Sequence, residues 1–145
     1  MYKTVLLAYD GSEAGQKALL DCREIVEGSH AELRLIAVMP HPVTSVAAEG
    51  WVYTQDADVA HRRHHQAVLD SGLTRLREAG LKVEGELVQG DSVQEIARCA
   101  SRIGADLIVL GHKHLDSWAE RWWRGSVSKA LIEQAPCSVL VAITR

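Results

Sequence analysis

The sequence predicts a three-layer α/β sandwich, in which helices cover both faces of a five-stranded parallel sheet. Short apolar runs alternate along the chain with segments of helical periodicity, giving five strands and four intervening helices. The runs at residues 5–9 and 106–110 are continuously apolar, which is typical of strands buried on both faces. Such parallel strands need crossover connections, and helices provide them. With 145 residues the chain has the size of one domain, so a single domain over residues 1–145 is expected.

The first half of the chain has clear element boundaries. Strand 5–9 is followed by Asp10-Gly11-Ser12, and Ser12 is a favourable N-cap for a helix that Gly28 is expected to end. A second strand is predicted over residues 33–38. Residues 40–55 hold two prolines and a glycine without periodicity, which indicates a long connection. A helix over residues 57–79 follows, with Gly80 as its C-cap and an apolar stripe in its second half alone.

The second half repeats the alternation. Residues 81–89 alternate between apolar and polar, as expected of an edge strand with one wet face. Asp91 or Ser92 caps the next helix, which ends at Gly104. Strand 106–110 is expected to stop at Gly111, and a polar segment then fills residues 112–124. The last helix opens at 125–126, directs Val127 and its neighbours Ala130 and Leu131 inward, and is broken before strand 138–142.

Composition excludes several classes of protein. The net charge of −3 provides no bulk positive field for a nucleic-acid backbone. No stretch approaches the length of a membrane span or of a secretory signal, so a cytoplasmic protein is expected. The three cysteines (Cys22, Cys99 and Cys137) form no CxxC pair and are expected to be reduced thiols in the core. Phe is absent, and three of the four Trp (Trp118, Trp122 and Trp123) lie within six residues; a short packed helix or a partner-facing patch would explain them.

A ligand site is expected where strand order reverses, at the carboxyl ends of the strands. Two segments lie there: the turn at residues 10–12, and the segment from Gly111 to Ser126 that runs into a helix N-terminus. Free N–H groups at such a terminus suit a phosphate, and hydroxyls at Ser126 and Ser128 would add donors. Asp10 would contact a ribose or a magnesium ion, or simply cap the following helix.

The chain resembles the universal stress protein family over nearly its whole length. The resemblance rests on four segments taken together: LLAYDGS at 6–12, LIVLGH at 107–112, GSVS at 125–128 and APCSVLV at 135–141. It implies a Rossmann-like sheet in the order 3-2-1-4-5, a dimer that pairs through the last strand, from Ser138 to Ala142, and regulation under stress rather than a defined enzymatic reaction.

One branch of that family binds ATP through Gly, two residues, Gly, nine residues, Gly and then Ser or Thr. Here Gly111 opens the pattern and Gly125-Ser126 closes it, but His114 replaces the second glycine and the second gap holds ten residues. The resemblance places Asp10 near ribose and phosphates, and Val38 and Ala8 at the adenine. Side chains of His112, Lys113 and His114 would contact phosphate, beside Val127 and Ser128 at the helix start.

Two functions therefore stand side by side. In the first, the chain is a dimeric cytoplasmic stress regulator that binds ATP, with magnesium as a possible companion and an unidentified protein partner. In the second, it is a nucleotide-free interaction module, as in the branch that lacks the glycine motif. An adenylating or electron-transferring enzyme has only the analogy of fold in its favour. No nucleophile stands beside a base, so no catalytic residue is predicted.

One histidine pair has the spacing of metal ligands. His61 and His65 lie one helical turn apart. The interrupting Arg62 and Arg63 favour an exposed helix face instead, and no acidic residue or cysteine completes a set. His112 and His114 beside Asp116 are a second, equally incomplete combination.

Overall fold

A five-stranded parallel sheet forms the centre of the molecule. The computed structural model describes residues 1–41, 46–47, 50–51, 55–113 and 127–144. In sequence order the strands of the sheet are β1 (Thr4–Ala8), β2 (Glu32–Met39), β5 (Val83–Gln89), β6 (Leu107–Lys113) and β7 (Ser138–Thr144). They lie side by side as β5-β2-β1-β6-β7, which confirms the order 3-2-1-4-5. Two short antiparallel strands, β3 (Val46–Ala47) and β4 (Gly50–Trp51), interrupt the long connection after β2.

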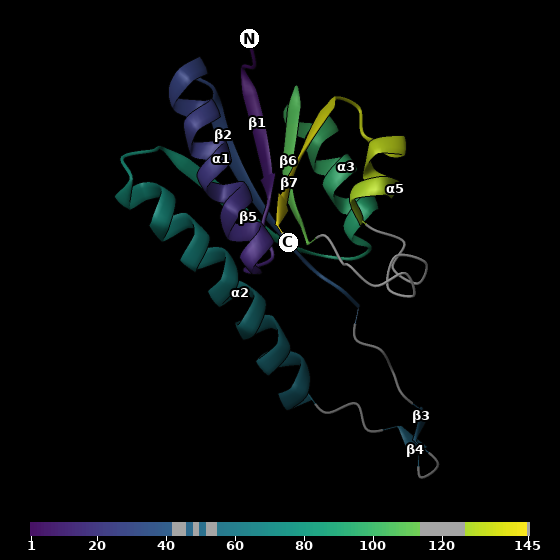
Figure 1. The fold of residues 1–145 in the computed structure, drawn as a ribbon. Helices are drawn as coiled ribbons and strands as arrows, with labels where there is room; N and C mark the ends of the chain where they lie inside the picture. Colours follow the sequence, from purple (N-terminus) through teal and green to yellow (C-terminus); the bar gives the residue numbers. More distant parts are fainter. Residues whose placement is uncertain (42–45, 48–49, 52–54, 114–126, 145) are drawn as a thin grey trace.

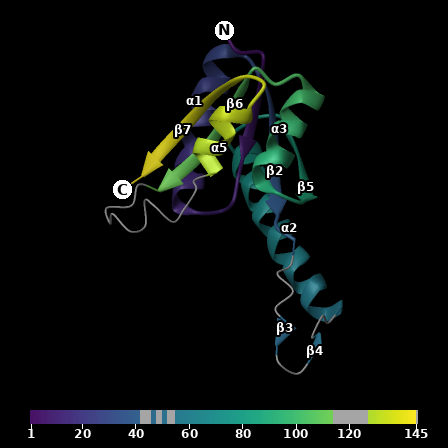
Figure 2. The same cartoon turned by 90° about the vertical axis from the view of Figure 1, so that its right-hand side faces the viewer.

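Two helices cover each face of the sheet, so the predicted three layers are confirmed (Figure 1). On one face lie α1 (Glu13–Ser29) and α2 (Gln55–Glu78); on the other lie α3 (Ser92–Ile103) and α5 (Val127–Gln134). The view turned by 90° shows α2 running well past the end of the sheet (Figure 2). None of the helices in the described part of the chain has the length and hydropathy to cross a membrane.

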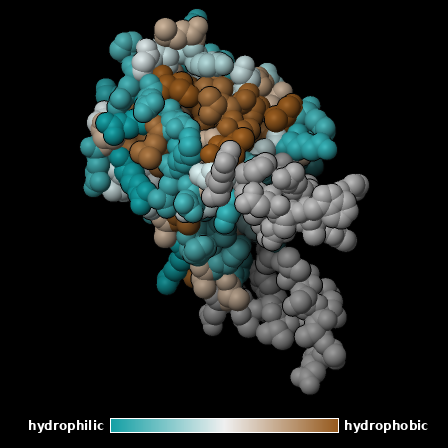
Figure 3. Space-filling model, in the orientation of Figure 1, coloured by the Kyte–Doolittle hydropathy of each residue, from teal (hydrophilic) through white to brown (hydrophobic). Residues whose placement is uncertain are grey.

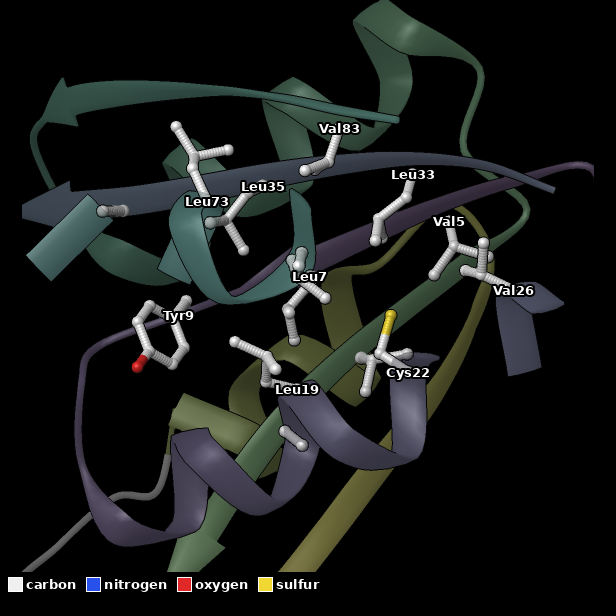
Figure 4. Packing of buried hydrophobic residues seen from close by; sticks show 14 of the residues in the cluster. Val5, Leu7, Tyr9, Leu19, Cys22, Val26, Leu33, Leu35, Leu73 and Val83 are labelled. Atoms are coloured by element: carbon white, nitrogen blue, oxygen red, sulfur yellow. The ribbon is translucent and has the colours of Figure 1, made fainter. Parts of the chain in front are cut away.

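The core separates into two apolar clusters, one on each side of the sheet. Alternation along β1 explains this: Leu7 points into the cluster under α1 and α2, whereas Leu6 points into the cluster under α3 and α5. The first cluster packs Leu19 and Cys22 of α1 against Leu7 and Tyr9 (Figure 4). Aliphatic and small side chains dominate both clusters, as the absence of Phe requires.

Helix termini follow the predicted chemistry with one correction. The Ser12 hydroxyl caps α1, and the Asp91 carboxylate caps α3 by accepting from the Gln94 amide. The prediction that Gly28 ends α1 is wrong. The helix continues through Ser29, whose hydroxyl donates to the Ile25 carbonyl (2.7 Å), and it ends at His30 in the left-handed region (φ 56°).

Two strands extend at their carboxyl ends by two or more residues beyond the predicted bounds. β6 continues through Gly111 to Lys113, and β7 continues to Thr144. These extensions pair with each other, so pairing with β7 stabilises the strand conformation of Gly111, His112 and Lys113, whose side chains carry no strand signal. His112 and Lys113 therefore belong to a strand, not to the polar segment in which the sequence placed them.

Candidate functional site

The turn after β1 is held by a compact network of hydrogen bonds. Asp10 Oδ1 accepts from both the amide (3.0 Å) and the hydroxyl (2.5 Å) of Ser12. The same hydroxyl accepts from the amide of Gly15 (3.0 Å) and so caps α1. Gly11 adopts φ +77°, a conformation that favours glycine. Asp10 thus shapes the turn, but Ser12 and not Asp10 caps α1, and the Asp10 side chain remains exposed to solvent.

Two glycines allow the start of α1 to lie unusually close to the Asp10 side chain and to the backbone of β6. A Cβ on Gly15 would lie 2.6 Å from Asp10 Oδ1, and a Cβ on Gly111 would lie 2.1 Å from the carbonyl oxygen of Ala14. The first turn of α1 therefore packs directly on the backbone of β6. No sequence motif pointed to Gly15; a small residue three positions after the N-cap was the available signal.

Strand register aligns the predicted adenine wall. Ala8 pairs with Ile36 on one side and with Leu110 on the other. Val38 and His112 each lie two residues further along these neighbouring strands. Because side chains alternate along a strand, all three belong to the face covered by α3 and α5. The structure thus brings Ala8, Val38 and His112 to one side of the sheet near its carboxyl end.

Other predicted site residues do not join this group. Lys113 alternates to the opposite face, the same face as Gly111, and its side chain is exposed. Val127 was expected to point inward, but 41% of its surface is exposed because it stands at the first position of α5. Ser128 is buried at 7% exposure. His114, Gly125 and Ser126 lie outside the described residues, as do Trp118, Trp122 and Trp123.

The cysteines have the environment of packing residues. Burial, with a smaller contribution from Asp21, raises the pKa of the Cys22 thiol to about 12. The pKa of the Cys99 thiol is raised to about 11 by burial and by the Glu86 carboxylate, which accepts a hydrogen bond from Cys99 Sγ (3.1 Å). Since the thiolate is the nucleophile, neither is suited to redox chemistry. Cys137, expected in the core, is only half-buried at the start of β7.

Comparison with known proteins places the chain in a family. The model of the universal stress protein family matches residues 1–142. A universal stress protein of Methanocaldococcus jannaschii is 30% identical over 97% of this chain and 82% of its own length. Universal stress protein YxiE of Bacillus subtilis is 27% identical over 97% of this chain and 99% of its own. The chain belongs to the universal stress protein family.

Solved structures agree with this fold. A universal stress protein in complex with cAMP superimposes with a TM-score of 0.72 at 23% identity, covering 97% of this chain and 96% of that one. An Arabidopsis thaliana family member with AMP bound gives 0.72 at 19% identity, covering 99% and 92%. The Archaeoglobus fulgidus protein in complex with dAMP gives 0.66 at 18% identity, covering 97% of each chain.

Proposed function

We propose that this protein is a stress-response regulator that binds an adenine nucleotide at the carboxyl ends of β1, β2 and β6. The observation that carries the proposal is the alignment of Ala8, Val38 and His112 on one face, beside the exposed Asp10. This is the point where strand order reverses, which is where open α/β sheets bind ligands. Relatives of the same fold crystallised with cAMP, AMP and dAMP support an adenine nucleotide as the ligand.

We assign the parts of the ligand from this arrangement. Ala8 is small enough to leave room for the base, and Val38 borders it on the next strand. Asp10 is exposed beside the ribose position. His112, on the same face as Ala8, contacts the phosphates more directly than Lys113 does. Gly125 and Ser126, with Val127 and Ser128 at the start of α5, complete the phosphate side; ATP with magnesium is the proposed ligand.

Calorimetry on dialysed protein tests this proposal. Mg-ATP, AMP and cAMP are titrated separately into the wild type and into the variants Asp10→Asn and His112→Asn. Both variants are expected to bind more weakly, because each loses a contact to ribose or phosphate. Asp91→Asn is the matched control, since Asp91 likewise lies between a strand and a helix but beyond the far edge strand, β5. An absence of heat with all three ligands at millimolar concentration would refute nucleotide binding.

The regulator is proposed to act as a cytoplasmic homodimer through β7, with a further protein as its unidentified partner. β7 is an edge strand, and unpaired apolar edges promote association. Ile143 of β7 and Ile132 of α5 are 54% and 61% exposed. Hydrophobic surface gathers over this side of the molecule (Figure 3). Sedimentation equilibrium is expected to show a dimer that Ile143→Lys weakens; a wild-type monomer at tens of micromolar would contradict this.

The nucleotide-free interaction module remains the second candidate, and Gly111 is the observation that favours it. The close approach of Gly111 to Ala14 accounts for this glycine without any nucleotide. His114, in place of a motif glycine, points the same way. In this case His114→Gly would leave nucleotide binding undetectable. Under the nucleotide proposal the same substitution is expected to strengthen ATP binding, because backbone contact with phosphate becomes sterically easier. No enzymatic turnover is part of either proposal.

A further inference from the structure

Helix α2 changes character where it leaves the sheet. Its second half packs Leu69, Leu73 and Leu76 into the core. Val68 is the next residue toward the N-terminus on this stripe, and it lies at the turn after β1, where a Cβ on Gly11 would be 3.1 Å from its side chain. Beyond that point the helix extends past the sheet in both views (Figures 1 and 2).

The inward stripe continues there with two histidines. His65 precedes Val68 by three residues and His61 precedes His65 by four, so all three share one side of the helix. Both histidines are half-buried, whereas the intervening Arg62 and Arg63 are exposed on other sides. The arginines therefore do not separate the pair, contrary to the expectation from the sequence.

The two imidazole rings are already in contact and one of them has a defined tautomer. Their centroids are 4.4 Å apart with an interplanar angle of 67°. His65 Nδ1 lies 3.0 Å from the backbone carbonyl oxygen of His61. A carbonyl only accepts, so Nδ1 carries the proton and donates, and the neutral ring keeps the Nε2 lone pair free. Metal-bound histidines use this arrangement, because the second-shell hydrogen bond orients the ring and raises its basicity.

His61 presents the complementary anomaly. Its Nε2 atom is buried and has no hydrogen-bond partner among the residues that the structure describes. An unsatisfied buried polar atom is costly and calls for an explanation, and an ion is one of the usual ones. A shared cation between the two rings would satisfy this nitrogen and use the free lone pair of His65 at the same time.

The observed spacing is close to that of two imidazoles on one metal ion. With metal–nitrogen bonds of about 2.0–2.1 Å and angles of roughly 90–110°, ring centroids would be about 4.7–5.4 Å apart. The rings at 4.4 Å would need to open by about 1 Å or less, which small side-chain rotations provide. We propose that His61 and His65 chelate a divalent transition-metal ion, such as Zn²⁺, Ni²⁺ or Cu²⁺, across one turn of α2.

The remaining coordination positions would be filled by water. No group of three or more His, Cys, Asp or Glu suited to a metal occurs among the described residues, so this is a two-ligand site of moderate affinity. Imidazole ligands favour Cu²⁺ over Ni²⁺ and Zn²⁺ and bind Mg²⁺ or Ca²⁺ poorly. The bound ion would link two successive turns in the part of α2 that extends beyond the sheet.

Titration of nucleotide-free, tag-free protein with Zn²⁺ and Ni²⁺ tests the site independently of the proposed function. Calorimetry gives the affinity, and the histidine ring signals in NMR report which residues respond. His61→Asn and His65→Asn are each expected to weaken binding more than tenfold. His64 is unsuitable as a control, because its ring centroid lies 5.3 Å from that of His65. His30→Asn is the matched control instead, because His30 is exposed at the C-cap of α1 and asparagine tolerates its left-handed conformation. This variant is expected to bind within about twofold of the wild type.

Circular dichroism and urea unfolding of each variant establish that the fold is intact. Zn²⁺ is also expected to raise the thermal midpoint of the wild type but not that of the His61→Asn/His65→Asn double variant, because binding to the native state stabilises it. The proposal is overturned if the wild type binds neither ion at 1 mM, if the folded double variant binds as the wild type does, or if His30→Asn abolishes binding.

Discussion

Substitution of Gly111 by alanine is the sharpest test of how the candidate site is built. The new Cβ would lie 2.1 Å from the carbonyl oxygen of Ala14, 2.2 Å from its carbonyl carbon and 2.6 Å from the amide nitrogen of Gly15. Ordinary contact begins at 3.4 Å, so the first distance is 1.3 Å too short. All three atoms belong to the backbone, and no side-chain rotation relieves the overlap.

The cost follows from what must move. Either the start of α1 lifts from β6 or the end of β6 shifts, and both disturb the packing of buried Ala14 and Ala18. Overpacking a core costs about 1–3 kcal/mol, and a rigid backbone obstacle places Gly111→Ala at the upper end, about 3 kcal/mol or more. For a chain of this size that corresponds to a fall in the thermal midpoint of roughly 6–12 °C.

Urea unfolding followed by circular dichroism, without nucleotide, measures this difference. Gly28→Ala is the matched control, because Gly28 is exposed in α1 and a Cβ there meets nothing within 4 Å. Alanine is the better helix former, so the control is expected to be stabilised by up to about 1 kcal/mol. If the free energy of unfolding of Gly111→Ala lies within about 0.5 kcal/mol of the wild-type value, the loss is well below the cost of overpacking, and the close approach of α1 to β6 is refuted.

Three further outcomes follow from the described contacts. Ser12→Ala removes the cap of α1 and is expected to cost about 1 kcal/mol in urea unfolding; no loss would show that the hydroxyl does not cap. The buried Cys22, with its raised pKa, is expected to resist iodoacetamide at pH 8 until the protein unfolds, and rapid labelling of the native state would contradict its burial. Backbone amides of Lys3 and Thr4 donate to Asp106 and lower its pKa, so its stabilising contribution is present above about pH 4 and disappears as the pH falls through the lowered value. In Asp106→Asn the free energy of unfolding should therefore fall less steeply below pH 4 than in the wild type. An unchanged pH dependence in this range would exclude this contribution.

Much of the fold was accessible from local patterns. Apolar runs and helical periodicity identified every strand of the main sheet and every described helix, because burial of one face imposes those periods directly. The caps at Ser12 and Asp91 were equally readable, since each is a contact within three residues. The strand ends were wrong where a distant strand decides the outcome: β6 reaches Lys113 because β7 pairs with it.

The candidate site was likewise only partly predictable from local sequence patterns. Sequence motifs alone placed Ala8, Asp10, Val38 and Gly111 at the ends of strands, and they suggested a ligand there. Only the register between strands revealed that His112 shares a face with Ala8 while Lys113 points away. The sequence likewise contained the His61 and His65 spacing, but it suggested an exposed helix face.

What the sequence by itself determined is the class of element, its period and its local caps, and through the family motifs the order of the strands. What only the tertiary structure decided is proximity between residues far apart in the chain. Gly111 lies on the backbone of Ala14, and α2 carries two half-buried histidines beyond the sheet. The physical reason is that periodicity and capping arise from interactions within a few residues, whereas close packing depends on how separate elements fit together.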